Sequence, residues 1–223
     1  MLASADMLEI VVTGRGGHAS MPHDALDPIP IACEIVTAIQ SYVTRRMPAF
    51  DPVVITIAKI EAGTTDNVIP ETASLLGTIR TLSPENRSAV HAGLRKLAEG
   101  IAAAHGAAAK VDIELGFPVT RCDGRAVALG RRVVEELYGE ATWLTLPAPV
   151  MGAEDFSYVL EKTPGAMLFL GASAKGSDWR SCCGLHSNRM VIDESIMARG
   201  AAVLAGMAAS FLGGSDEFRA APR

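Results

Sequence analysis

The chain has 223 residues, of which 49% are hydrophobic and 20% are charged, and its formal net charge is −5. This composition is ordinary for a folded globular protein and argues against extensive disorder. The charged residues form no basic stripe, so we expect no nucleic-acid partner. The N-terminus lacks a basic and then apolar leader, and no apolar run approaches about 18 residues. We therefore expect a cytoplasmic protein with no membrane partner.

Aromatic residues and cysteines are scarce, and their scarcity excludes further classes of protein. Aromatic residues make up only 5% of the chain, so the core should consist mainly of small aliphatic side chains, and the strands lack the aromatics on which nucleic-acid bases stack. The four cysteines are too few and too unevenly spaced for a disulfide framework. The adjacent pair Cys182-Cys183 is not a CxxC motif for zinc or redox chemistry.

Residues 7–117 alternate between strand and helix patterns. Residues 8–13 are rich in β-branched side chains and end at a glycine run, which predicts a strand followed by a loop. Helices are expected to begin at Asp27-Pro28 and at Ser83-Pro84, because the serine can cap the helix and proline suits the first turn. Three further strands are expected at residues 52–60, 73–81 and 110–115.

The resulting order, β-α-β-β-α-β, is the ferredoxin-like arrangement. It predicts a four-stranded antiparallel sheet with both helices on one face. The edge strands of such a sheet need a partner or protecting charges, because their backbone groups are unpaired.

Phe117-Pro118 interrupts this pattern and predicts a domain boundary. The sequence that follows predicts helices at about 125–138 and 194–212, strands near Leu146 and at 166–170, and a loop at 151–155 that leads into another helix. This alternation indicates a piece of an α/β layer with too few strands for a complete domain. The predicted divisions are therefore 7–117, 118–213 and a flexible tail at 214–223.

Three side chains in the first part are candidates for a site. His18 lies in a loop between glycines and Pro22, where it could polarise a carbonyl or bond local backbone. Asn67 follows a Gly-Thr-Thr-Asp run, so it is either a turn residue or an amide donor to a substrate. Arg80 lies in an apolar strand and either faces solvent or binds a carboxylate with its two-pronged guanidinium. These alternatives stay open on the pattern alone.

The second part offers fewer candidates. Glu154 and Asp155 precede a predicted helix, where acids either complement the helix dipole or approach an active site from a strand–helix loop. His186 could bind a divalent metal, but one histidine makes no site, and the sequence has no HxD, HxxE or HxxxH spacing. His91 and His105 are interpreted as solvated helix residues, and His23 as a surface residue.

Four segments, in order, resemble the M20 family of metallopeptidases, in particular its hippurate hydrolase, aminoacylase and indole-acetyl-amino-acid hydrolase branch. They are GRGGHASMPHDALDPI (14–29), GTTDNVIPETASLLGTIRTL (63–82), MGAEDFSY (151–158) and LHSNRMVIDE (185–194). The resemblance implies a ferredoxin-like lid that makes a homodimer, followed by the closing part of an α/β zinc-peptidase-like catalytic domain.

The resemblance also implies roles for six residues. His18 corresponds to the lid histidine that reaches the scissile carbonyl in the partner's active site, and His186 to the last metal ligand. The residues expected to bind substrate are Asn67, Arg80, Gly152 and Glu154, with Arg80 aimed at a free carboxylate.

The implied reaction is metal-dependent hydrolysis of an N-acyl amino acid, or of a small peptide, to a carboxylic acid and an amino acid. Family members carry a segment before the lid that holds the other ligands of a dinuclear centre of Zn, Mn, Co or Ni, together with the general base. Because this sequence begins almost at the first strand of the lid, we expect at most partial metal binding and an inactive lone chain. The alternative is a non-catalytic M20-type dimerisation or regulatory module.

Overall fold

The structure is a computed structural model that describes residues 1–174, 176 and 184–214. Its internal contacts group the chain into two compact units, residues 1–121 with 148–162, and residues 122–147 with 163–223. Compact units are not the same as independently folding domains, so the predicted divisions at 7–117 and 118–213 stay a prediction. Most of the predicted tail, residues 215–223, lies outside the described residues.

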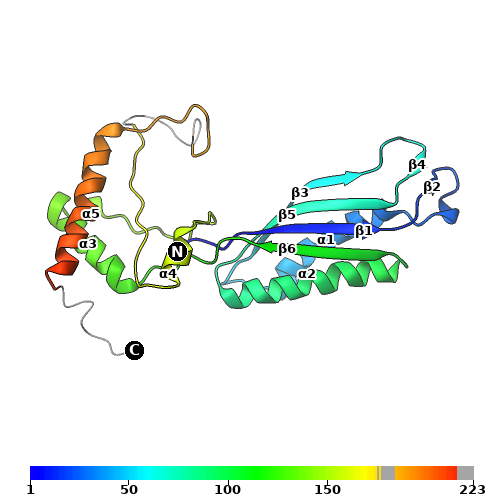
Figure 1. Cartoon of the computed structure of the whole chain (residues 1–223), viewed down its shortest axis with the longest axis horizontal. Helices are drawn as coiled ribbons and strands as arrows, with labels where there is room; N and C mark the ends of the chain where they lie inside the picture. The colour runs from blue at the N-terminus through cyan, green and yellow to red at the C-terminus, as the bar shows by residue number, and fades with distance from the viewer. Residues whose placement is uncertain (175, 177–183, 215–223) are drawn as a thin grey trace. The chain divides into compact units, whose positions relative to one another are not determined.

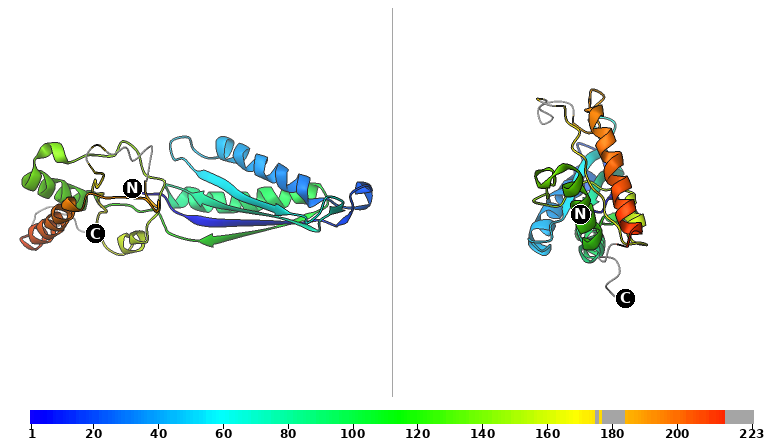
Figure 2. Two further views of the ribbon diagram at one scale, coloured as in Figure 1. Left: turned by 90° about the horizontal axis from the view of Figure 1, so that it is seen from above. Right: turned by 90° about the vertical axis from the view of Figure 1, so that its left-hand side faces the viewer.

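The first unit is built on a four-stranded antiparallel sheet with two helices on one face (Figures 1 and 2). Its strands, in the order β3-β5-β1-β6, are Val54–Ala62 (β3), Thr72–Arg80 (β5), Asp6–Thr13 (β1) and Ala108–Leu115 (β6). The helices are α1 (Pro28–Arg46) and α2 (Pro84–Ala104). This topology confirms the ferredoxin-like prediction, and every strand end lies within two residues of its predicted position.

Alternating side chains of the central strands form the core beneath the helices. Every second residue of β1, beginning at Leu8, is buried, and its antiparallel neighbour β5 buries Leu75 and Ile79. Helix residues such as Ile35 and Leu94 pack against these strand residues and complete the core. Burying a side chain of this size stabilises the fold by roughly 1.5–3 kcal/mol. Among the described residues no aromatic side chain is fully buried, which confirms the predicted aliphatic core.

Both long helices begin where the sequence predicts. The Asp27 carboxylate accepts a hydrogen bond from the backbone N–H of Ile29 at 2.9 Å, and α1 starts at the next residue, Pro28. The Ser83 hydroxyl oxygen accepts one from the backbone N–H of Asn86 at 3.2 Å, and Pro84 occupies the first position of α2. Each cap satisfies a backbone donor that the helix cannot satisfy itself.

A second, two-stranded sheet was not predicted. It pairs β2 (Gly17–His18) with β4 (Val68–Ile69), and a short 3-10 helix, η1 (Pro22–Asp24), follows β2. The sequence indicated a loop at the first of these segments and only a link to the next strand at the second. Two-residue strands are too short to leave a periodic pattern, so residue alternation could not reveal them.

The predicted helices of the second part are confirmed, but the predicted strands are wrong. The helices are α3 (Gly124–Tyr138), α4 (Phe156–Leu160) and α5 (Met197–Leu212), with η2 (Glu140–Thr142) and η3 (Glu194–Ile196) between them, and α4 belongs to the first unit. In the described part of the chain, residues near Leu146 and residues 166–170 form no strand. A strand needs a neighbour for its backbone hydrogen bonds, and no described segment pairs with either one.

Residues Glu194–Leu212 are long and apolar enough, by length and composition alone, to cross a membrane. The sequence reading missed this stretch because Glu194, Ser195 and Arg199 interrupt its apolar run. Helices packed within soluble proteins can meet the same criterion, and Gly206 of α5 lies against Val133 of α3. The absence of a membrane partner therefore stays a prediction.

Candidate functional site

His18 and Asn67 meet at one end of the first unit, the end formed by β2 and β4 (Figure 1). His18 pairs with Val68, and the backbone N–H of Ala19 donates to the Asn67 carbonyl at 3.0 Å. The glycine run makes this fold possible, because a Cβ on Gly14 would lie 2.0 Å from the Leu26 carbonyl oxygen. We call His18 and Asn67 the tip pair.

The hydrogen bonds of His18 determine which of its two ring nitrogens is available to a ligand. Its Nδ1 lies 3.1 Å from the Ser20 backbone nitrogen and 2.8 Å from the Ser20 hydroxyl. A backbone N–H can only donate, so Nδ1 accepts, and the proton of the neutral ring lies on Nε2. Nε2 has no hydrogen-bond partner among the described residues, and the side chain is exposed. The predicted local bond is therefore present, and it leaves the opposite nitrogen as a donor.

Asn67 is arranged in a similar way. Its side-chain oxygen accepts from the Thr65 hydroxyl at 3.3 Å, which leaves the amide NH2 group as a donor at the exposed surface. Beside it lies an open pocket of about 400 Å³ with a partly polar lining of Glu61, Ala62, Gly63, Thr64, Val68, Pro70, Thr72 and Ser74. The tip therefore offers two hydrogen-bond donors next to a recess.

Arg80 lies at the opposite end of the sheet. It is the last residue of β5, whereas the tip pair lies beyond the first residue, Thr72, so the two are separated by about 26 Å of strand. Arg80 alternates with buried Ile79, which places it on the sheet face without helices. Arg80 is half-buried as a residue, and its guanidinium makes no ion pair with a carboxylate in the part of the chain that the structure describes. It is therefore free to bind an acidic group.

Gly152 and Glu154 lie at the same end as Arg80. The N-terminal segment connects the two regions, because Ser4 N–H donates to the Thr81 carbonyl at 2.8 Å and Ala3 N–H donates to the Val150 carbonyl at 3.0 Å. Glu154 is half-buried, and its carbonyl accepts bonds from Ser157 at the start of α4. We call Arg80, Gly152 and Glu154 the base group.

His186 belongs to the second unit and has an unusual backbone. Its φ of 68° lies in the left-handed region, where it is the one residue other than glycine among the described residues. Such conformations cost energy and cluster at functional sites, although histidine tolerates them better than most residues. The imidazole is exposed in a turn. Its preceding neighbours Cys182 and Cys183 lie outside the described residues.

The residues described do not form a metal centre by themselves. No group of three or more His, Cys, Asp or Glu side chains within residues 1–174, 176 and 184–214 could hold a metal ion. His186 is therefore at most one ligand of such a centre.

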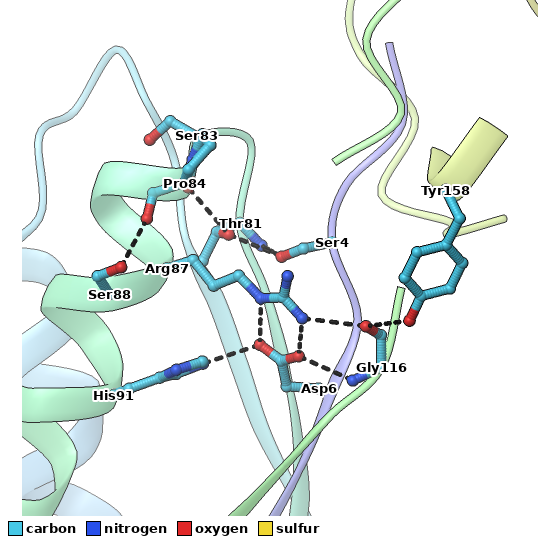
Figure 3. Close-up of polar contacts among 10 residues, drawn as sticks. All are labelled: Ser4, Asp6, Thr81, Ser83, Pro84, Arg87, Ser88, His91, Gly116 and Tyr158. Atoms are coloured by element: carbon cyan, nitrogen blue, oxygen red, sulfur yellow. Dashed lines mark hydrogen bonds and ion pairs between the residues drawn. The ribbon is translucent and has the colours of Figure 1, made fainter. Parts of the chain in front are cut away.

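The sequence reading missed a buried ionic cluster at the base of the sheet (Figure 3). The Asp6 side chain is fully buried and accepts hydrogen bonds from Arg87 Nε at 2.9 Å, His91 Nε2 at 2.8 Å and the Gly116 N–H at 3.1 Å. Burial opposes ionisation of Asp6, but the bonds from Arg87, His91 and Gly116 outweigh it and hold the pKa of this carboxyl below its usual value. The charge of Arg87 is stabilised in return, which raises the pKa of its guanidinium.

The interpretation of His91 as a solvated residue is therefore wrong. Its side chain is 17% exposed and bonds to the buried carboxylate, whereas the His105 side chain is exposed and pairs with Glu34 at 2.7 Å on the surface. A signal was present in the sequence. Asp6 is in phase with Leu8 and the rest of the buried face of β1, and Arg87 and His91 lie one turn apart on α2.

Comparison with known proteins identifies the family of the first part of the chain. Residues 3–106 match the family described as the peptidase dimerisation domain. A solved structure described as a dinuclear metal-binding peptidase from the M20 family, from Bacillus subtilis, has a TM-score of 0.73 and 29% identity, and it covers 96% of this chain and 51% of that one. Residues 3–106 are therefore a dimerisation domain of the M20 type, and the proteins to which the chain is similar are M20 hydrolases.

Curated M20 relatives are hydrolases. The chain is 35% identical over 197 residues to an N-acetylcysteine deacetylase of Bacillus subtilis, covering 88% of this chain and 49% of the relative. It is 32% identical over 212 residues to a hippurate hydrolase of Campylobacter jejuni, covering 95% of this chain and 54% of the relative. The chain thus spans about half the length of the curated relatives it matches.

Proposed function

We propose that this chain is the lid and the closing catalytic portion of a metal-dependent amidohydrolase that cleaves N-acyl amino acids. The products would be a carboxylic acid and a free amino acid. The names of two relatives, a hippurate hydrolase and an N-acetylcysteine deacetylase, support this substrate class. The lone chain is expected to be inactive, because its described residues hold no metal centre.

The observation that carries the proposal is the separation of the candidate residues into two groups. The tip pair offers hydrogen-bond donors, and the base group offers a guanidinium without a partner, about 26 Å further along β5. One N-acyl amino acid is far too short to contact both ends of a single sheet. In a dimerisation domain, however, the tip of one subunit can serve the site at the base of its partner.

The chemistry of each side chain suits this division. His18 Nε2–H and the Asn67 amide would donate to the scissile carbonyl of a substrate held by the partner, and would stabilise the oxyanion that develops there. Arg80 would bind the free carboxylate of the amino acid through two parallel hydrogen bonds. Gly152 and Glu154 would line the same substrate site.

The metal supplies the chemistry that these residues lack. We propose that the complete enzyme uses two divalent ions, Zn, Mn, Co or Ni, to activate water and polarise the carbonyl, in line with the dinuclear metal-binding relative. His186 would be one ligand. The other ligands and the general base would come from outside the described residues.

The dimer is proposed to form along the β3 edge of the lid. Both edge strands carry an ion pair and accept a bond from a helix side chain: Lys110–Asp112 and Arg95 to the Val111 carbonyl at β6, and Lys59–Glu61 and Gln40 to the Ile55 carbonyl at β3. The β3 edge in addition exposes two apolar side chains along its length, Val54 (41%) and Ile60 (53%). We therefore expect two β3 strands to pair, which would extend the sheet across the dimer.

Light scattering at micromolar concentration tests this surface. The unaltered chain should have the mass of a dimer, and Ile60→Glu should shift it toward the monomer, because a charge would be buried at the edge. Leu115→Glu, at the exposed end of β6 (66%), is the matched control and should leave the dimer intact. A monomeric unaltered chain, or equal effects of both variants, would contradict the β3 dimer.

The activity is tested by amino-acid release from N-acetyl and N-benzoyl amino acids with Mn²⁺, Co²⁺ or Zn²⁺ and a chelator control. We expect no release by the chain alone, and metal-dependent release once it is joined by the segment that carries the remaining ligands. No release by that assembly would favour the non-catalytic dimerisation module. Metal-dependent release by the chain alone would refute the incomplete-site proposal.

His18→Ala in the active assembly tests the proposed tip chemistry. Loss of an oxyanion donor should lower kcat by roughly 100-fold or more with a smaller change in KM, because the bond strengthens in the transition state. His23→Ala is the control, since His23 is 74% exposed and pairs only weakly with Asp24. An unchanged kcat for His18→Ala would exclude this role.

A further inference from the structure

The loop that carries Gly152 and Glu154 is attached to the base of the sheet on both sides. Before the loop, Val150 forms a parallel bridge with Leu2, and its carbonyl accepts the Ala3 N–H. After the loop, the Tyr158 hydroxyl of α4 donates to the Gly116 carbonyl at 3.1 Å (Figure 3). Residues 148–162 accordingly group with the lid in the first compact unit.

Gly116 is the residue to which Tyr158 attaches the chain after the loop. Its carbonyl accepts from both Tyr158 and Arg87, each at 3.1 Å, while its N–H donates to Asp6. Only glycine fits this position, because an added Cβ would lie 2.3 Å from the Ala5 carbonyl oxygen. The backbone is thereby held with its carbonyl directed at the two donors.

Arg87 is itself fixed by the buried Asp6 carboxylate, which it contacts through Nε and a terminal nitrogen. The guanidinium therefore has little freedom to move and presents a further N–H to Gly116. A chain of hydrogen bonds runs from Asp6 through Arg87 and the Gly116 carbonyl to Tyr158. It begins at the first residue of β1 and ends on the helix that follows the loop.

We propose that Tyr158 is a positioning residue that ties the Gly152–Glu154 loop to the base of the lid. Its hydroxyl acts through the Gly116 carbonyl, so the loop moves together with the strands that enter and leave the sheet. The contribution of the loop to substrate binding rests on the proposed function, whereas the attachment itself does not. In the complete enzyme this would keep Glu154 in a constant position relative to Arg80.

Removal of a single hydroxyl tests the attachment in the chain as it exists. The Tyr158 ring packs edge-on against Phe117, with centroids 6.1 Å apart, so Tyr158→Phe should keep the ring in place and lose only the bond. We expect amide hydrogen exchange in residues 151–162 to rise about threefold to tenfold, the effect of one neutral hydrogen bond. Tyr42→Phe is the matched control, because the Tyr42 hydroxyl also donates to a carbonyl, that of Ala89, at 3.2 Å.

Each result has a defined meaning. Faster exchange of residues 151–162 in Tyr158→Phe but not in Tyr42→Phe would support the attachment, and unchanged exchange would overturn it. In the catalytically active assembly, Tyr158→Phe should raise KM about threefold to tenfold with little change in kcat, and an unchanged KM would overturn the positioning of substrate. If no assembly is active, the proposed function fails, while the exchange experiment still decides the attachment.

Discussion

Arg87→Met is the substitution that most directly tests the buried ion pair. The fully buried Asp6 carboxylate accepts four hydrogen bonds, two from Arg87 and one each from His91 and Gly116. Methionine retains the apolar stem of arginine but removes both guanidinium bonds. Removing one partner of a buried pair costs about 3–5 kcal/mol, and we expect about 3 kcal/mol because His91 and Gly116 still stabilise the charge.

Native-state amide exchange along β1 measures this loss within the first unit. An opening free energy lower by about 3 kcal/mol should make the slowest β1 amides exchange roughly 100-fold faster. Arg15→Met is the control, because the exposed Arg15 side chain makes, among the described residues, a single 3.3 Å bond to the Asp24 carbonyl, and its loss should change exchange little. Adding Asp6→Leu to Arg87→Met should recover much of the loss, since no unpaired charge then remains. If Arg87→Met resembles the control, the reasoning is refuted.

Three further predictions concern the stability of the first unit, measured by the same β1 exchange. The lowered pKa of Asp6 means that its stabilising effect is complete above about pH 4 and is lost as the pH falls through the folded-state value, and Asp6→Asn should abolish this acid dependence. Ser83→Ala should cost about 1–2 kcal/mol, because it removes the cap of α2 and the bond to Asp51; an unchanged opening free energy would contradict this. Gly100→Ala should stabilise α2 by about 0.5–1 kcal/mol, because nothing lies within 4 Å of the added Cβ; a loss of stability would show that the helix is crowded there.

Local patterns were sufficient to predict the four-stranded sheet and the two long helices of the first unit. The alternation of β1 and β5 identifies two strands, Asp27 and Ser83 mark the helix starts, and the element order leaves one common topology. These features depend on neighbouring residues, so a single sequence contains them. The prediction of a strand at 166–170 was wrong for the complementary reason. An apolar run indicates that a segment tends to be buried, but it does not indicate whether another strand pairs with that segment.

Contacts between distant residues were beyond local patterns. The phase of Asp6 in β1 and the spacing of Arg87 and His91 on α2 mark these residues as candidates, but Asp6 and Arg87 are 81 residues apart and no local pattern shows that they pair. The meeting of His18 and Asn67 depends on two strands of two residues each. The resemblance to M20 proteins pointed to both tip residues, but only the structure shows that the Nδ1 atom of His18 accepts bonds from Ser20 and that Arg80 lies at the far end of β5.

The pairing of β1 with β5 fixes the distance between the tip pair and the base group. Their register runs without a shift over eight residue pairs, from Asp6 opposite Ile79 to Thr13 opposite Thr72, whereas the one irregularity of β5 pairing lies on the edge strand, between Ile57 and Lys59 of β3. Packed sheets of this kind deform little, so the distance between tip pair and base group is set by the fold. Under the proposed function, the geometry of catalysis would then depend on how two lids pair, and a change at the dimer edge would displace His18 from the substrate without altering Arg80.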